Sequence, residues 1–392
     1  MKRYLRFFAI VGALALVLAA CGDDSSEDTT TTEGAPDVTE AAAGEETTTT
    51  AAAAEEETAT TAAMLIGEGR EIGMAFDIGG RGDQSFNDLA ALAWDDGKRM
   101  YGYTGRELAP DAGGENREEN LRLLAETGSE MIIANGFAFA QNVWRVGTDF
   151  PDVNFAITDD CPQDDTFTVV EMENVRCMLF SEEQGSFLVG AAAAMKSTSG
   201  TIGFIGGVDV PLIKKFQAGY EAGARFVDPD ITILPAIYLT QVPDFSGFND
   251  PVKGKEAGLS LYSQGADVVY HAAGGSGLGL FQAADEASTD DTHLWAIGVD
   301  ADQYTIFVEA DESLAEHILT SMLKRVDVAV GNAVKDQLEG NFAPGALRLG
   351  LAEEGVGYST SGGFIDDIVD ALDALADQII DGSIEVPTEP EA

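Results

Sequence analysis

The chain of 392 residues is apolar at 45% of its positions and carries 68 acidic against 22 basic side chains, a formal net charge of −46. This length suits two α/β lobes, and such acidity argues against a surface that binds RNA or DNA. The three cysteines and three histidines lack the spacing of metal ligands, which argues against a structural zinc site. We expect no metal and no cofactor.

The first twenty residues are typical of an export signal. Three basic residues among the first six precede a mostly apolar run over residues 7–18, which is shorter than the roughly 20 residues of a membrane-spanning helix. The run leads into Leu18-Ala19-Ala20-Cys21, which resembles the bacterial lipobox. The resemblance implies cleavage before Cys21 and acylation of that cysteine, with palmitate among the acyl chains. We therefore expect a lipid-anchored protein on the extracytoplasmic face of the cell membrane.

Residues 21–66 are composed mainly of Thr, Ala and Glu, with twelve acidic residues and no Lys or Arg. Such a composition cannot form a hydrophobic core. We expect a disordered stalk, with a root-mean-square reach of roughly 40 Å for a flexible chain of this length.

From residue 71 short apolar runs alternate with amphipathic segments, the pattern of parallel βαβ units. The expected strands cover residues 72–76, 131–134, 153–158, 175–180, 201–205, 231–238, 267–270 and 294–299. The expected helices cover residues 85–100, 138–147, 185–195, 211–227, 251–264, 277–287, 322–338 and 364–380. The pattern predicts two open parallel sheets.

Ligands of open parallel sheets bind beyond the carboxyl ends of the strands, where loops gather polar groups and helix N-termini present N–H groups. The polar residues at these ends are Asp77, Asn135, Asp159 and Asp300, next to Gly-rich loops after Ile205 and Tyr270. Each Asp has an alternative role as the cap of the helix that follows it.

Near-matches to catalytic motifs fail at defining positions. Residues 190–197 resemble a phosphate-binding loop, but Met195 occupies the place of its second glycine. The loop over residues 274–279 misses both the dinucleotide fingerprint and the hydrolase nucleophile elbow at a required glycine. We expect no catalytic residue and no enzyme.

Cys161 and Cys177 are the cysteines that remain after Cys21. Export would place them in an oxidising compartment, which favours a disulfide. That bond would close a loop of about 15 residues and contribute roughly 3 kcal/mol. The alternative is a pair of buried free thiols.

The segment Phe76-Asp77-Ile78-Gly79-Gly80, continued through a Ser-Phe-Asn helix start at residues 85–87, resembles the basic membrane protein (BMP) family. This family comprises substrate-binding lipoproteins, the PnrA-like purine nucleoside receptors of ABC transporters. The likeness covers about residues 71–385 and continues in segments 134–140, 151–159, 180–192, 203–216, 270–282, 298–300 and 320–329.

The resemblance implies an α/β type I periplasmic-binding-protein fold. Two Rossmann-like lobes would be joined by a three-segment hinge, with the ligand cleft between them. The chain would cross between lobes near Phe180, Asp300 and Phe342. Lobe 1 is then expected to comprise residues 67–180 plus 301–342, and lobe 2 residues 181–300 plus 343–387.

The resemblance also implies roles for individual residues. Phe86 and Phe216 would stack on the two faces of a nucleobase, while Asn87 and Asp159 would bind its edge. The ribose would be held by Asp77, Asp300, Lys324 and the backbone of Gly275 and Gly277. Phe137 is a further candidate contact, with a place in the core as its alternative. Lys324 is expected to open a helix.

The implied function is that of a monomeric receptor that closes on a nucleoside, with purine nucleosides as the first candidates, and delivers it to ABC permease subunits. It would meet the membrane only through its lipid anchor. Binding of a sugar or other small polyol by the same fold, or nutrient sensing without transport, are alternatives. An exported hydrolase and an adhesin are disfavoured, and the base preference stays open.

Overall fold

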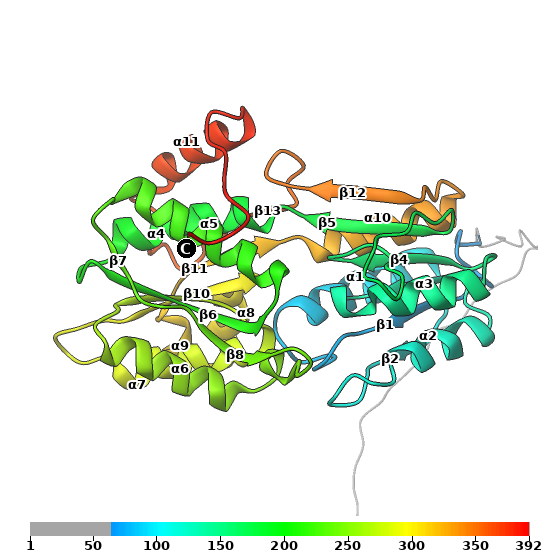
Figure 1. Cartoon of the computed structure of the whole chain (residues 1–392), viewed down its shortest axis with the longest axis horizontal. Helices are drawn as coiled ribbons and strands as arrows, with labels where there is room; N and C mark the ends of the chain where they lie inside the picture. Colours follow the sequence, from blue (N-terminus) through cyan, green and yellow to red (C-terminus); the bar gives the residue numbers. More distant parts are fainter. Residues whose placement is uncertain (1–63, 392) are drawn as a thin grey trace, which may run out of the picture. The chain divides into compact units, whose positions relative to one another are not determined.

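The computed structural model describes residues 64–391, so the expected signal segment, Cys21 and almost all of the expected stalk lie outside the described residues. Within residues 64–391 no helix is long and apolar enough to cross a bilayer. The described chain forms two sheets of mainly parallel strands, each covered by helices, as the alternating pattern predicted (Figure 1). We call these two α/β units lobe 1 and lobe 2.

The sheet of lobe 1 is entirely parallel. In spatial order it contains β12 (Gly345–Leu349), β5 (Val175–Phe180), β4 (Asn154–Thr158), β3 (Met131–Ala134), β1 (Ile72–Ala75) and β2 (Glu107–Leu108). The central strands β1 and β3 are buried along their whole length. Burial on both faces explains their continuous apolar sequence, because helices cover a parallel sheet on each side.

The sheet of lobe 2 has a corresponding strand order. It contains β13 (Val356–Tyr358), β11 (Ile318–Lys324), β10 (Trp295–Asp300), β9 (Val268–Ala272), β6 (Thr201–Asp209) and β7 (Thr232–Ile233), and β8 (Ile237–Gln241) also pairs with β6. β13 runs antiparallel to β11, in contrast to the parallel pairing of β12 with β5 in lobe 1.

Eleven α-helices and three short 3₁₀ turns connect the described strands. The helices are α1 (Phe86–Tyr101), α2 (Arg117–Glu126), α3 (Ala140–Asp149), α4 (Glu182–Lys196), α5 (Pro211–Val227), α6 (Pro251–Ser263), α7 (Leu278–Ala287), α8 (Gln303–Ala310), α9 (Glu312–Ala315), α10 (Val326–Glu339) and α11 (Val369–Ile380). The turns are η1 (Phe137–Phe139), η2 (Ser246–Phe248) and η3 (Gly274–Gly277).

The structure corrects two of the three expected crossovers between lobes. The first falls between β5 and α4, as expected near Phe180. The expected crossover near Asp300 is wrong, because β11 follows β10 in the same sheet and the chain crosses only after Lys324. The expected crossover near Phe342 is also wrong, because β12 pairs with β5 in lobe 1 (Figure 1). The chain returns to lobe 2 between Leu349 and Val356.

These corrections have a local cause. Residues 318–324 form a buried strand that is followed almost directly by the amphipathic helix α10, so the sequence predicted a single helix from residue 322. β12 is largely exposed and lacks an apolar signal. Only its hydrogen bonds to β5 identify it as a strand.

Close packing of α4 against α5 shapes lobe 2 beside the crossover. A Cβ atom at Gly219 of α5 would lie 2.1 Å from the carbonyl oxygen of Glu183 on α4. Only glycine allows this approach, since real Cβ atoms cannot come so near a backbone oxygen. The contact brings the first turn of α4 against the middle of α5.

Cys161 and Cys177 are joined by a disulfide, with their Cα atoms 5.1 Å apart. The bond ties the loop after β4 to the middle of β5. This loop carries Phe167, whose side chain is exposed.

Candidate functional site

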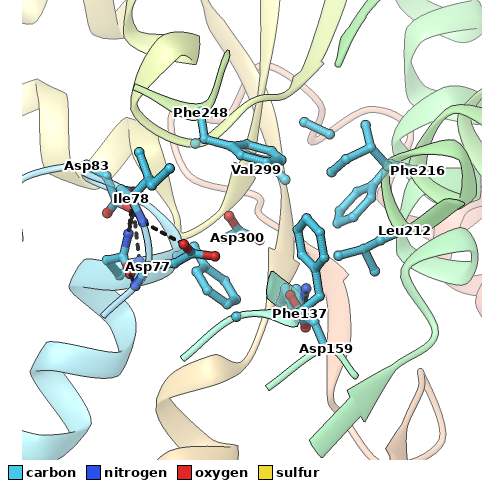
Figure 2. A pocket seen from close by; sticks show the side chains of 17 residues that line it. Asp77, Ile78, Asp83, Phe137, Asp159, Leu212, Phe216, Phe248, Val299 and Asp300 are labelled. Carbon is cyan, nitrogen blue, oxygen red and sulfur yellow. Dashed lines mark hydrogen bonds and ion pairs between the residues drawn. The ribbon is translucent and has the colours of Figure 1, made fainter. Parts of the chain in front are cut away.

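A pocket between the carboxyl ends of the two sheets gathers most of the candidate residues. The empty space within it, counted together with open solvent at its mouth, is about 610 Å³. Figure 2 shows Asp77 and Asp83 together on one side, with Phe216 and Leu212 on the other. The lining residues are Asp77, Ile78, Asp83, Phe86, Asn87, Gly136, Phe137, Asp159, Leu212, Ile213, Phe216, Phe248, Ala272, Gly274, Val299, Asp300 and Lys324.

The two central aspartates share an unusual backbone conformation at equivalent places. Asp159 directly follows β4 with φ 73°, and Asp300 ends β10 with φ 64°. Asp tolerates this left-handed region better than most residues, and such residues cluster at functional sites. Each sheet therefore presents one carboxylate to the pocket from this left-handed conformation.

Lys324 is the cation at the centre of these carboxylates. Its side chain is 2% exposed, and its Nζ lies 2.7 Å from Oδ1 of Asp159 and 3.2 Å from Oε1 of Glu182. The contact with Asp159 joins the two lobes, since Asp159 belongs to lobe 1 and Lys324 to lobe 2. Lys324 ends β11, so the expectation that it opens a helix was wrong.

Burial disfavours the charged forms of these groups, whereas the attraction between the ammonium and the carboxylates favours them, so the two shift each pKa in opposite directions. Burial opposes the charge of Lys324, but Asp159, Glu182 and Asp300 outweigh it and raise the pKa of the ammonium. Burial raises the pKa of both Asp159 and Asp300, against the lowering effect of Lys324. The group therefore holds a firmly protonated lysine beside carboxylates that protonate more readily than usual.

Aromatic rings enclose the lysine and line the pocket. The Nζ atom lies 5.2 Å from the ring centroid of Phe86, 5.0 Å from that of Phe180 and 5.5 Å from that of Phe216. These distances suit cation–π attraction. Phe137 lines the pocket and meets Phe248 edge to face, whereas Phe139 is fully buried in the core (Figure 2).

The loop before α1 is organised by Asp83, which the sequence analysis did not select. Its carboxylate accepts bonds from the backbone N–H groups of Ser85, Asn87 and Asp88, so it caps the helix. Burial raises the pKa of Asp83 to about 6, although those N–H groups lower it. Asp83 thus holds Phe86 and Asn87 at the pocket wall.

Asn87 is held by the protein itself. Its Oδ1 accepts from the backbone N–H of Asp77 and from Asn135, and its Nδ2 donates to Asp83 and to the carbonyl of Ile78. Every polar atom of the amide therefore has an internal partner. Asn87 can support Asp77 at least as readily as it can bind a ligand.

Asp77 is paired with a buried arginine that the sequence analysis also missed. Nε of Arg117 lies 3.0 Å from Oδ1 of Asp77, and the guanidinium stacks over Phe245 of lobe 2 at 5.3 Å. Arg117 opens α2 after Gly113-Gly114, in a chain with few basic residues. Because basic residues are so few, an arginine next to a Gly-Gly turn could have been selected from the sequence as a site candidate.

The glycine loop after β9 meets the pocket at Gly274, not at the expected Gly275 and Gly277. A Cβ at Gly277 would lie within 2.4 Å of the His271 ring, so this glycine makes room for a buried histidine. Burial lowers the pKa of His271 to about 4, which keeps the ring neutral. Gly275 instead faces Asn249 and Asp83.

Several contacts join the lobes around the pocket. Ser85 of lobe 1 donates its hydroxyl to Oδ2 of Asp300 at 2.6 Å. Gln303 of lobe 2 donates Nε2 to the carbonyl of Gln84 at 3.1 Å. Phe137 packs edge to face on Phe245, with ring centroids 5.9 Å apart. These contacts describe lobes that are closed upon one another.

The residues that the structure describes offer no cluster of metal ligands. No group of three His, Cys, Asp or Glu side chains within residues 64–391 is placed to hold a metal ion. The arrangement can enclose a flat, hydroxylated molecule between aromatic walls and offer carboxylate oxygens to its hydroxyl groups.

Comparison with known proteins identifies the class. The model of the family described as Bmp, ABC transporter substrate-binding protein PnrA-like, matches residues 71–390. A solute-binding protein of an ABC transporter system from Aeropyrum pernix K1 is 28% identical, covering 82% of this chain and 94% of its own, with a TM-score of 0.69. The fold is therefore the type I fold of periplasmic solute-binding proteins.

The chain belongs to the Bmp family of ABC transporter substrate-binding proteins. An uncharacterized lipoprotein of Pyrococcus furiosus is 34% identical over 74% of this chain and 70% of its own length. The ABC transporter nucleoside-binding protein BmpA of Lactococcus lactis is 28% identical over 80% of this chain and 88% of its own. As a member of this family, the chain is an ABC transporter substrate-binding protein.

Proposed function

We propose that this substrate-binding protein is a nucleoside receptor, with purine nucleosides as the first candidates. The observation that carries the proposal is the composition of the pocket wall. Phe86 and Phe216 supply aromatic surface for a base, while Asp159 and Asp300 supply oxygens for ribose hydroxyls. The named function of the Lactococcus lactis relative supports the same ligand class.

Charge favours a neutral ligand over a nucleotide. Lys324 is the only Lys or Arg among the residues lining the described pocket, and its ammonium is already paired with Asp159. A phosphate group would meet Asp77, Asp83, Asp159 and Asp300 without a free cation to balance it. A nucleoside brings hydroxyl donors and no negative charge.

The remaining parts of the proposal concern how the receptor is held and used. Cleavage before Cys21 and acylation, including palmitate, would anchor a monomer to the outer face of the cell membrane through lipid alone. Closure of both lobes on the ligand would create the form that permease subunits recognise. The lipoprotein among the relatives supports this location.

The decisive test is a ligand panel followed by calorimetry on the purified chain, freed of carried-over ligand by unfolding and refolding. The panel contains inosine, guanosine, adenosine, cytidine, uridine and thymidine, with free bases, ribose, galactose and myo-inositol. A nucleoside at 100 times its Kd should stabilise the protein by about 2.7 kcal/mol.

A matched pair of variants ties binding to the pocket. Phe216→Ala should weaken nucleoside binding about 5-fold to 150-fold, because base stacking on an aromatic ring contributes roughly 1–3 kcal/mol. Phe226→Ala, on the same helix but exposed and outside this pocket, should leave the Kd unchanged. A response to sugars or polyols alone would favour that alternative ligand class, and silence from every ligand would overturn the proposal.

A further inference from the structure

A buried glutamate outside the pocket wall connects the ligand site to the crossover between lobes. Glu182 begins α4 directly after the first crossover, and its side chain has no exposed surface. Its Oε1 lies 3.2 Å from Nζ of Lys324, and its Oε2 lies 3.3 Å from Nζ of Lys215 on α5. Lys324 itself immediately precedes the second crossover.

The position of Glu182 limits how it can act. It is absent from the residues that line the pocket, so a ligand would not touch it. Its influence must pass through Lys324, which continues the contact to Asp159 at 2.7 Å. A buried carboxylate at such a place needs its cations, because an unpaired buried charge is strongly destabilising.

The charged and titratable groups near Glu182 come from both lobes. They are Asp159 after β4, Tyr270 on β9, Asp300 on β10, Lys324 on β11, Lys215 on α5 and Glu183 on α4. Three carboxylates thus surround one fully buried ammonium, and the second ammonium, that of Lys215, is partly exposed.

We propose that Glu182 is a positioning residue of the ligand site. Its carboxylate holds the Lys324 ammonium beside Asp159. It also places a third negative charge near Asp159 and Asp300, the carboxylates that would accept hydrogen bonds from the ligand's hydroxyl groups. The inference rests on the proposed nucleoside function, and it assigns to Glu182 a role in tuning that site.

Electrostatics supports this role. Burial raises the pKa of Asp159 and of Asp300, and the charge of Glu182 raises both further. Because a protonated carboxyl group loses acceptor capacity, nucleoside affinity should fall as the pH drops through these values. Removing the charge of Glu182 lowers both pKa values, which moves the acid limb of binding to lower pH.

The test measures Kd by calorimetry on the full chain from pH 4.5 to pH 8, with inosine as probe and guanosine, adenosine and uridine in parallel. Glu182→Gln keeps the side-chain size and should lower affinity about tenfold at pH 8, above the acid limb, because Lys324 then pairs with Asp159 alone and competes with the ligand's hydroxyl groups for that carboxylate. The midpoint of the acid limb should fall by about one pH unit. Glu183→Gln is the matched control, since this neighbouring buried glutamate does not contact Lys324, and it should move neither quantity.

A second variant tests the role of Glu182 if Glu182→Gln fails to fold. Lys215→Gln removes the partly exposed cation and leaves the charge of Glu182 less balanced, so the acid limb should move to higher pH, opposite to Glu182→Gln. Wild-type binding with unshifted limbs in the folded variants would overturn the role of Glu182. Absence of wild-type binding to all nucleosides would instead overturn the proposed function, and this inference with it.

Discussion

Lobe 1 and lobe 2 place acidic side chains at matching strand ends, but they use them differently. Asp159 and Asp300 occupy equivalent positions on β4 and β10, and both reach the pocket. Asp77 after β1 also lines the pocket, whereas Asp209 at the end of β6 pairs with Lys214 near the surface. An acidic residue at a strand end can therefore serve the site, but it does so only where the fold buries it in the pocket.

The next pair of strand ends differs in chemistry as well as in use. β5 ends in Phe180, and the corresponding strand β11 ends in Lys324, whose Nζ lies 5.0 Å from the Phe180 ring. The shared framework thus brings an aromatic ring and a cation together from opposite lobes. The site depends on this asymmetry, because two rings there would leave Asp159 and Asp300 without a cation.

The largest expected effect comes from removing the buried cation of lobe 2. Lys324→Met should lower the free energy of unfolding by about 3–5 kcal/mol, since it leaves buried carboxylates without their partner. Arg325→Met is the neighbouring control, whose partly exposed pair with Asp327 should be worth less than about 1 kcal/mol. Urea unfolding at pH 7 measures the free energy of unfolding of both variants. Equal losses in the two would contradict the idea that burial makes the Lys324 contacts important.

A second comparison uses the paired aspartates after β1 and β6. Arg117→Leu in lobe 1 should cost about 2–4 kcal/mol, because Asp77 is then left largely buried and unpaired. Lys214→Leu in lobe 2 should cost less than about 1 kcal/mol, because its pair with Asp209 is about one third exposed. Denaturant midpoints of the two variants test this difference, which would disappear if the strand ends were equivalent.

The smallest expected effect concerns pH and two helix-capping aspartates. Burial raises the pKa of Asp83 in lobe 1 to about 6, whereas the backbone N–H of Lys253 lowers the pKa of exposed Asp250 in lobe 2. The contribution of Asp83 is fully present below pH 4 and is lost as the pH rises through 6. Asp83→Asn should therefore reduce the loss of stability between pH 4.5 and pH 7 by about 1–2 kcal/mol.

Asp250→Asn provides the opposite control for this pH dependence. The contribution of Asp250 is present above its ordinary pKa and is lost only as the pH falls below it, so its replacement should leave the slope between pH 4.5 and pH 7 unchanged. Thermal unfolding across this range compares the two variants. A steeper slope in Asp83→Asn would show that its carboxylate is not the buried group responsible.

Much of the fold could be predicted because burial leaves a clear trace in sequence. The continuous apolar runs of β1, β3 and β4 identified them as parallel strands. β11 was missed because α10 follows it almost directly, and β12 because it is exposed. Both errors moved the expected crossovers, since these two strands define where the chain changes lobe.

The residues of the candidate site fall into two groups: those that local sequence could predict and those that depend on contacts between distant parts of the chain. Asp77, Asp159 and Asp300 were predicted because the carboxyl ends of parallel strands must meet at one edge. Arg117, Asp83 and Glu182 were missed because they lie in loops or helix starts, far in sequence from the charges they contact. Gly277 was misinterpreted because no sequence pattern reveals the His271 ring against it.

The sequence by itself determined the two α/β units, the family resemblance and the strand-end carboxylates, because these follow from local periodicity and short motifs. Only the tertiary structure decided which charges pair. Lys324 meets Asp159 across the lobes, and Glu182 joins Lys324 to Lys215, through contacts between residues 33 to 165 positions apart. The strength of an ion pair depends on the distance between its charges and on their burial, and both are set only when the lobes have folded and come together.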